Sequence, residues 1–159
     1  IRAEALCMKK GILGDRVALE VNAKEVVHRN NNNSDLTVYG YTPMMVSVQC
    51  VQKTMDHCNH ACVQYVLKDR YQKEFRGVCS CEFCYNTIYN ALPTSLLKEK
   101  EKAEKLGVKA YRLSFTTETQ QETEKIVRAF VDVYLRGQKP DGQMQTEETT
   151  KGHFQRGVE

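Results

Sequence analysis

The 159-residue chain predicts an α/β fold, and its C-terminal half carries most of that prediction. Thr94 or Ser95 can cap a helix that runs to Leu106, and the glycine that follows can end it. Residues 110–115 predict a strand, and the threonines of residues 116–119 can cap a second helix. A helix, a strand and a helix joined by short connections form one unit of a parallel α/β fold.

The second helix has a clear apolar face. Its apolar residues recur at spacings of one, three and four, which indicates one side of a helix, and Gly137 and Pro140 mark its end. The residues of this face are Ile126, Val127, Phe130, Val133 and Tyr134.

The middle of the chain predicts several short strands. Residues 37–41 are rich in strand formers, and residues 44–48 are almost continuously apolar, which suits a strand buried on both faces. Residues 62–67 and 87–91 are further candidates, and the polar residues 69–73 predict a turn.

The N-terminal region predicts a helix over residues 2–10 and a short strand over 16–21, followed by an asparagine-rich surface loop over 30–35. We therefore expect an N-terminal segment of residues 1–36 and one α/β domain over residues 37–159. The chain begins with Ile1, so we expect a fragment of a longer parent chain as its natural context.

Composition excludes few classes of partner. The net charge is +3, with 41% hydrophobic and 27% charged residues, and acids and bases are interleaved, so RNA is allowed as a partner but not indicated. No stretch approaches the roughly 18 apolar residues of a membrane span, and the first residues lack a secretory pattern. We expect a soluble, cytoplasmic protein that does not bind a membrane.

Clustered cysteines predict a metal site. Six of the seven cysteines fall within residues 50–84, and thiols clustered on a helix-and-strand scaffold favour metal ligation over disulfides. Two sets of four cysteines are compatible with such a metal site. Cys58 and Cys62 with Cys81 and Cys84 match the spacing of structural zinc, which spacing alone slightly favours. Cys50 with Cys58, Cys81 and Cys84 can instead hold an iron–sulfur cluster. His57 and His60 are additional nitrogen candidates.

Several stretches resemble the C-terminal region of the collagenase-like peptidase family. The similarity covers residues 38–159, about three quarters of the chain, and its most specific parts are the Tyr-Gly-x-x-Pro block and the Cys-Tyr-Asn block. The stretches that carry it are residues 38–47 with Gln49 and Cys50, residues 67–70, 81–90 and 111–116, and the closing residues 152–159.

This resemblance implies a partial, barrel-like parallel α/β fold with a cysteine-rich metal-binding segment. Relatives include oxygen-independent hydroxylases of RNA bases or of quinone precursors, which use a 4Fe–4S cluster and, for the RNA enzymes, prephenate. Others carry only the peptidase name. The resemblance implies that the cluster ligands are Cys50, Cys58, Cys81 and Cys84. Cys62 and Cys79 do not fit the pattern of the family.

The chain departs from the family at two points. Arg76 stands where the family often has proline after the phenylalanine at Phe75, and the family's usual N-terminal half, with its own cysteine block, is absent from this sequence. We expect the remainder of the parent chain to be a partner of this part. No H-E-x-x-H or G-x-S-x-G motif supports a peptidase, and a thiolate bound to metal is not a free nucleophile for a Cys–His pair.

Five other residues are candidates for the site. Asp69 and Arg70 can contact substrate or phosphate, or form an ordinary surface turn. Arg112 lies in a strand expected to be buried, so it either pairs with an acid or faces an anion-binding pocket. Asn86 and Asn90 can orient the metal-binding loop or satisfy turn backbone.

Overall fold

The computed structural model describes residues 33–55, 58–140 and 148–152. The described residues form two compact units. The first consists of the described residues up to Gly40 together with those from Thr94 onward, and the second is Tyr41–Pro93. The helix predicted over residues 2–10 and the strand predicted over 16–21 lie outside the described residues.

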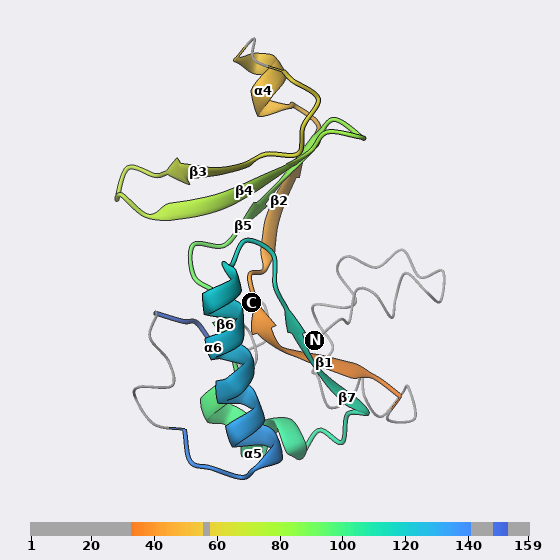
Figure 1. Ribbon diagram of the computed structural model, residues 1–159, viewed down its shortest axis with the longest axis vertical. Coiled ribbons are helices and arrows are strands. Elements are labelled where there is room, and N and C mark those ends of the chain that lie inside the picture. Colours follow the sequence, from red (N-terminus) through yellow and green to blue (C-terminus); the bar gives the residue numbers. More distant parts are fainter. Residues whose placement is uncertain (1–32, 56–57, 141–147, 153–159) are drawn as a thin grey trace, which may run out of the picture. The chain divides into compact units, whose positions relative to one another are not determined.

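The first unit is built on a three-stranded sheet with the order β6-β1-β7 (Figure 1). Strand β1 (Asp35–Gly40) pairs in parallel with β7 (Ala110–Ser114), and Leu36 lies opposite Tyr111 in that register. The short β6 (Thr94–Ser95) pairs with β1 in the antiparallel direction. The predicted strands over 37–41 and 110–115 are thus confirmed, within one or two residues at their ends.

Helix α6 (Gln120–Phe130) forms where the sequence predicts it. Thr119 and Glu122 form a capping box, in which the Thr119 side chain accepts from the Glu122 amide and the Glu122 carboxylate accepts from the Thr119 amide. The helix continues as one wider π-helical segment, Val131–Leu135, before Gly137 adopts a left-handed conformation.

The preceding helix is shorter than predicted. A single 3₁₀ turn, Leu97–Glu99, leads into α5 (Lys100–Glu104), and no side chain caps α5. The Ser95 hydroxyl accepts from the Leu97 amide at the start of the 3₁₀ turn, at 3.5 Å, as a capping residue does, but Thr94 and Ser95 themselves form β6, and the amide of Leu96 donates to the carbonyl of Val38. The pairing of β6 with β1 therefore determines the backbone conformation of these two residues.

The core of the first unit lies between the sheet and the helices. Tyr39 of β1 meets Phe115 and Phe130 with ring centroids 5.5 and 6.1 Å apart, and the Tyr134 hydroxyl donates to the carbonyl of Leu96. Burial of such apolar side chains is the main stabilising contribution to a unit of this kind. The buried cluster is Leu36, Val38, Tyr39, Leu96, Leu97, Ala103, Ala129, Phe130 and Val133.

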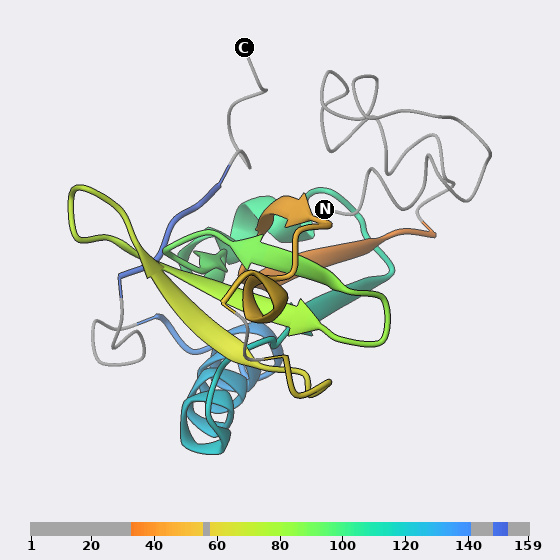
Figure 2. The same cartoon turned by 90° about the horizontal axis from the view of Figure 1, so that it is seen from above.

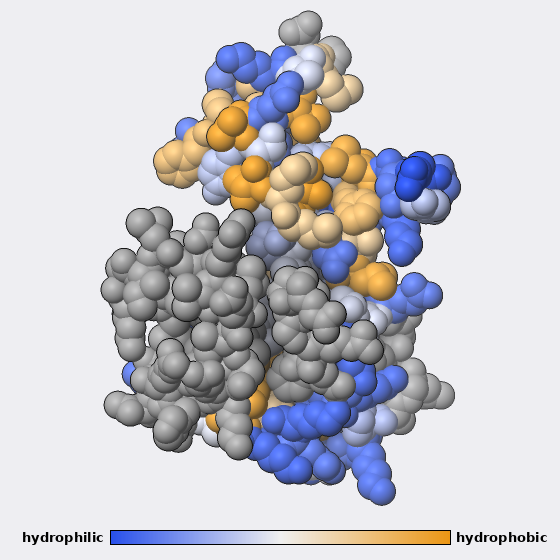
Figure 3. Space-filling model, turned by 180° about the vertical axis from the view of Figure 1, so that it is seen from behind, coloured by the Kyte–Doolittle hydropathy of each residue, from blue (hydrophilic) through white to orange (hydrophobic). Residues whose placement is uncertain are grey.

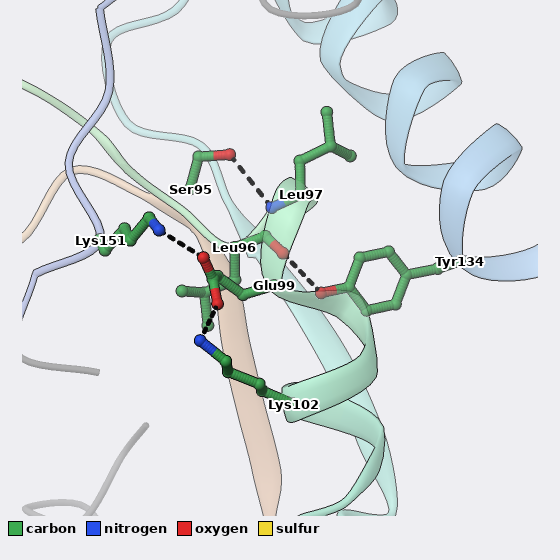
Figure 4. Close-up of polar contacts among 7 residues, drawn as sticks. All are labelled: Ser95, Leu96, Leu97, Glu99, Lys102, Tyr134 and Lys151. Carbon is green, nitrogen blue, oxygen red and sulfur yellow. Dashed lines mark hydrogen bonds and ion pairs between the residues drawn. The ribbon is translucent and has the colours of Figure 1, made fainter. Parts of the chain in front are cut away.

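Glu99 is a buried acid at the edge of this core (Figure 4). Its carboxylate pairs with Lys102 at 2.8 Å and with Lys151, which a short pairing of Thr150 with Thr94 holds nearby. The hydrogen bonds from Lys102 and Lys151 lower the pKa of Glu99 to about 2. The carboxylate is therefore stabilised in its charged form.

The second unit is an antiparallel sheet with the order β2-β5-β4-β3. Its strands are β2 (Pro43–Ser47), β3 (Gln64–Lys68), β4 (Glu74–Ser80) and β5 (Tyr85–Tyr89). The one-turn helix α4 (Val51–Thr54) follows β2, and Figure 2 shows it in front of the hairpin of β3 and β4. The predicted turn over residues 69–73 joins these two strands, with the Asp69 carboxylate accepting from two turn amides.

Two features of this sheet differ from the sequence-based expectations. Strand β2 is not buried on both faces, since Met44 and Val46 are 62% and 63% exposed, and Figure 3 shows apolar side chains on the surface of this unit. Strand β4 was not predicted, because Arg76 and Gly77 interrupt its apolar pattern. Arg76 instead stacks on the ring of Tyr41, with its guanidinium carbon 4.8 Å from the ring centroid.

The predicted α/β class holds in its general form, with strands and helices mixed along the chain. Among the described strands, however, only β1 and β7 pair in parallel, and both sheets have open edges rather than a closed barrel order. The parallel, barrel-like arrangement is therefore not observed in the part of the chain that the structure describes. Within that part, no helix has the length and apolar character needed to cross a membrane.

We expect Glu99→Gln to destabilise the first unit at pH 7 by about 1 kcal/mol, because both lysine partners are largely exposed and the ion pairs are solvent-screened. Since folding depresses the pKa of Glu99, its contribution is present above the unfolded value near 4.5 and disappears as pH falls toward 2. Urea unfolding of both proteins at pH 7, 4 and 2 should give converging stabilities. Glu101→Gln, at an exposed position of α5, is the control, and a difference that persists at pH 2 would contradict the assignment.

Candidate metal centre

The sheet of the second unit brings most of its cysteines together. Cys79, the next-to-last residue of β4, lies opposite Asn86 of β5, and Cys81 and Cys84 lie in the turn that joins these two strands. Cys50 immediately precedes α4, and Cys58 follows it after a short connection. A strand pair, a tight turn and a helix start thus each deliver thiols to the same region.

Three ligand atoms form a compact group. The sulfurs of Cys58 and Cys81 and a ring nitrogen of His60 all lie within 4.8 Å of one another. This Cys-His-Cys group could hold a metal ion, since thiolate sulfur and imidazole nitrogen are the preferred ligands of zinc and also bind iron. His60 and Cys84 adopt left-handed backbone conformations, with φ of 56° and 51°, which are uncommon for residues with a side chain.

Three more thiols lie near this group. The sulfurs of Cys50 and Cys79 are 3.6 Å apart, and both residues are buried, Cys79 completely at 0% exposure. Cys84 lies with its sulfur 3.7 Å from the carbonyl oxygen of Cys81. The thiols of Cys58, Cys50 and Cys84 all lie near enough to Cys81 to contribute to the rise of its pKa.

The thiols differ in their acidity. The backbone amide of Lys53 lowers the pKa of Cys50, which favours its thiolate. Burial raises the pKa of Cys79 to about 12, and the neighbouring Cys50 adds to the rise. Burial likewise raises the pKa of Cys81, with a further contribution from Cys58. Several thiols so close together cannot all ionise without a compensating positive charge, and a bound metal cation supplies one.

Only some of the ligands predicted from the sequence lie near the Cys-His-Cys group. Cys58 and Cys81 belong to the Cys-His-Cys group, and Cys50 and Cys84 act on the pKa of Cys81, while the roles of all four as ligands stay a prediction. Cys62 is exposed and lies outside the Cys58–His60–Cys81 group. Sequence reasoning did not place Cys79 beside Cys50, because that contact depends on the unpredicted strand β4.

The two predicted orienting asparagines have different surroundings. Asn86 is completely buried, and its amide nitrogen donates to the carbonyl of Gln49, which directly precedes Cys50, at 2.5 Å. It therefore fixes the backbone that leads into the cysteine group. Asn90 accepts from the amide of Ala91 and donates its own amide to Thr42, so it satisfies local backbone away from the thiols.

Tyr65 is a further residue beside the cysteines, and no sequence pattern predicted it. Its ring lies over Gly77, where an added Cβ would come within 2.3 Å of two ring carbons. Burial raises the pKa of the Tyr65 phenol, with additional effects from Cys79 and Cys50. The missing side chain at Gly77 is therefore what allows an aromatic ring to lie flat on β4 next to the thiols.

The predicted substrate contacts make interactions of their own. Arg112, in the middle of β7, has a side chain that is 42% exposed rather than buried, and it pairs with Asp35 of β1. Asp69 organises the turn before β4, and the Arg70 guanidinium lies over the ring of Tyr71 at 4.7 Å. These surroundings are those of structural residues, and the substrate-binding roles of all three stay predictions.

Comparison of the chain with family models, with curated proteins and with solved structures finds no match.

Proposed function

We propose that this chain is a metal-binding domain whose centre is held by Cys50, Cys58, Cys81 and Cys84. The observation that carries the proposal is the convergence of these thiols around Cys81, next to His60. Cysteine thiolates are the ligands of structural zinc and of iron–sulfur clusters alike. The second unit is also small, and domains of about 60 residues or fewer often need a metal to stabilise a limited core.

Our preferred centre is a 4Fe–4S cluster. Four cysteines dispersed over residues 50–84 can supply one thiolate to each iron of such a cluster, and the resemblance to the collagenase-like peptidase family favours the same set. When bound, the cluster would supply one-electron transfer. The residues of this chain would hold it, and Asn86 would keep the backbone before Cys50 in position through its bond to Gln49.

Zinc is the second candidate, and one observation favours it. A ring nitrogen of His60 lies within 4.8 Å of the sulfurs of both Cys58 and Cys81. Two cysteines, a histidine and one further cysteine make a closed tetrahedral site of the structural kind. In that case the chain would be a non-catalytic zinc-binding module.

For activity, we propose that the domain is part of an oxygen-independent hydroxylase acting on RNA bases or on a small aromatic precursor, with prephenate as a possible co-substrate of the RNA reaction. The resemblance supports this proposal, and the mixed charge of the chain is compatible with RNA. A cytoplasmic location and the remainder of the parent chain as partner belong to the same proposal. A collagenase-like peptidase is the alternative, but no protease motif supports it.

The identity of the metal is tested by anaerobic purification of the full 159-residue chain, followed by visible spectroscopy and analysis for iron, sulfide and zinc. We expect a brown protein with broad visible absorption and about equal amounts of iron and sulfide, as a cubane cluster contains. A colourless protein that holds one tightly bound zinc would reject the cluster and support the zinc module.

The ligand set is tested by single alanine variants. Cys50→Ala, Cys58→Ala, Cys81→Ala and Cys84→Ala should each lose the metal, because alanine offers no ligand atom. Cys62→Ala is the matched control from the same segment and should retain it, as should Cys79→Ala.

The variant His60→Ala distinguishes the two kinds of centre, since only a zinc site should lose its metal. Loss in Cys79→Ala with retention in Cys50→Ala would assign the fourth thiolate to Cys79 instead.

The activity is tested by mass spectrometry of RNA from cells that lack the parent gene. We expect a hydroxylated base to disappear, to return with the wild-type gene or with Cys62→Ala, and to stay absent with Cys81→Ala. Unchanged RNA in the deletion strain, together with metal-dependent proteolysis by the purified protein, would favour the peptidase.

A further inference from the structure

An open pocket lies on one face of the antiparallel sheet, within the second unit. Its volume is about 240 Å³, which is below the roughly 300–1,000 Å³ of pockets for drug-sized ligands, so it suits a smaller molecule. Because residues paired across strands share a face, Met45, Ile88 and Leu67 form its apolar floor. Val51 and Met55, at either end of α4, add apolar side chains at one side.

Two polar groups on this face have unused hydrogen-bonding capacity. Asn86 is completely buried and spends its amide nitrogen on Gln49, which leaves its Oδ1 as an acceptor with no partner among the described residues. The Tyr65 hydroxyl is also buried at the atomic level and lacks a partner within the same part of the chain. Both residues line the pocket. Buried polar atoms are normally paired, so two unpaired ones beside one pocket point to a ligand.

The position of Tyr65 is set by the sheet. Its ring occupies the space above Gly77, and Gly77 pairs with Ile88 of β5, which lies two residues from Asn86 on the same face of the sheet. None of the described residues that line the pocket carries a charge. An ionised ligand would therefore lose its hydration without gaining a counter-charge, which is costly.

We propose that this pocket binds a small, uncharged, flat molecule that presents a hydrogen-bond donor to Asn86 Oδ1 and an acceptor to the Tyr65 hydroxyl. A lactam edge, in which an N–H stands beside a carbonyl, has this pattern, and a ring attached to it can rest on Met45, Leu67 and Ile88. The inference does not rest on the metal, since every group that it uses belongs to the sheet. Cys50 and Cys79 act electrostatically on Tyr65, so the ligand lies close to the thiols.

The test compares two probes by ligand-observed saturation-transfer NMR, using the full chain with and without reconstituted metal. 2-Quinolone carries the lactam N–H, and N-methyl-2-quinolone has nearly the same shape without that donor. We expect 2-quinolone to bind about tenfold more tightly, because the methylated probe leaves Asn86 Oδ1 unpaired. Equal affinity for the two probes, or no binding of either, would overturn the proposal whatever metal the chain holds.

Variants of Tyr65 and Gly77 give an independent readout. Tyr65→Phe should weaken 2-quinolone binding about tenfold, and Gly77→Ala should weaken it as well by pushing the ring out of place. Tyr71→Phe, at an exposed tyrosine in the turn after β3, is the matched control and should bind normally. The N-methyl probe reports on Asn86 without mutating a residue that the fold needs. Unchanged binding by folded Tyr65→Phe would remove Tyr65 from the site and reject the lactam assignment.

Discussion

The convergence of cysteine thiols at one end of an antiparallel sheet is the constraint on which the second unit depends. Its buried described residues include Cys50, Cys79, Cys81 and Asn86, whereas Met44 and Val46 of β2 are largely exposed. Sulfur and amide groups thus occupy the place that aliphatic side chains fill in most small domains. A metal bound to these thiols would contribute directly to folding, because the ligands have no fixed arrangement in an unfolded chain.

The first unit is held together by different means. It buries a continuous cluster of aliphatic and aromatic side chains between a three-stranded sheet and α6, and Leu36 and Val38 of the central strand β1 are almost fully buried. Its polar contacts lie at the margin of that core, where Glu99 joins Lys102 to the late segment of the chain at Lys151. The first unit is therefore stabilised by an apolar core, and the second unit contains the candidate metal-binding residues.

Within the second unit, strands β4 and β5 connect the candidate metal site with the pocket. Gly77 and Cys79 lie two residues apart on one face of β4. They pair with Ile88 and Asn86 of β5, in that order. A residue with a side chain at Gly77 would displace the Tyr65 ring, and loss of Asn86 would release the backbone before Cys50. The same few positions therefore shape the thiol group and the surface next to it.

The sequence determined the parts of this protein that depend on local signals. The capping box at Thr119 and the apolar period after it specify α6, and the turn residues at 69–73 specify the hairpin. The clustering of cysteines in the sequence predicted a metal-binding segment, and the structure brings Cys58 and Cys81 together with His60 in a group that could hold a metal ion. Only the tertiary structure decided strand β4, the exposure of β2, the pairing of Arg112 with Asp35 and the position of Tyr65 over Gly77. Each of these depends on which strands pair, and strand pairing joins residues whose separation in sequence carries no local signal.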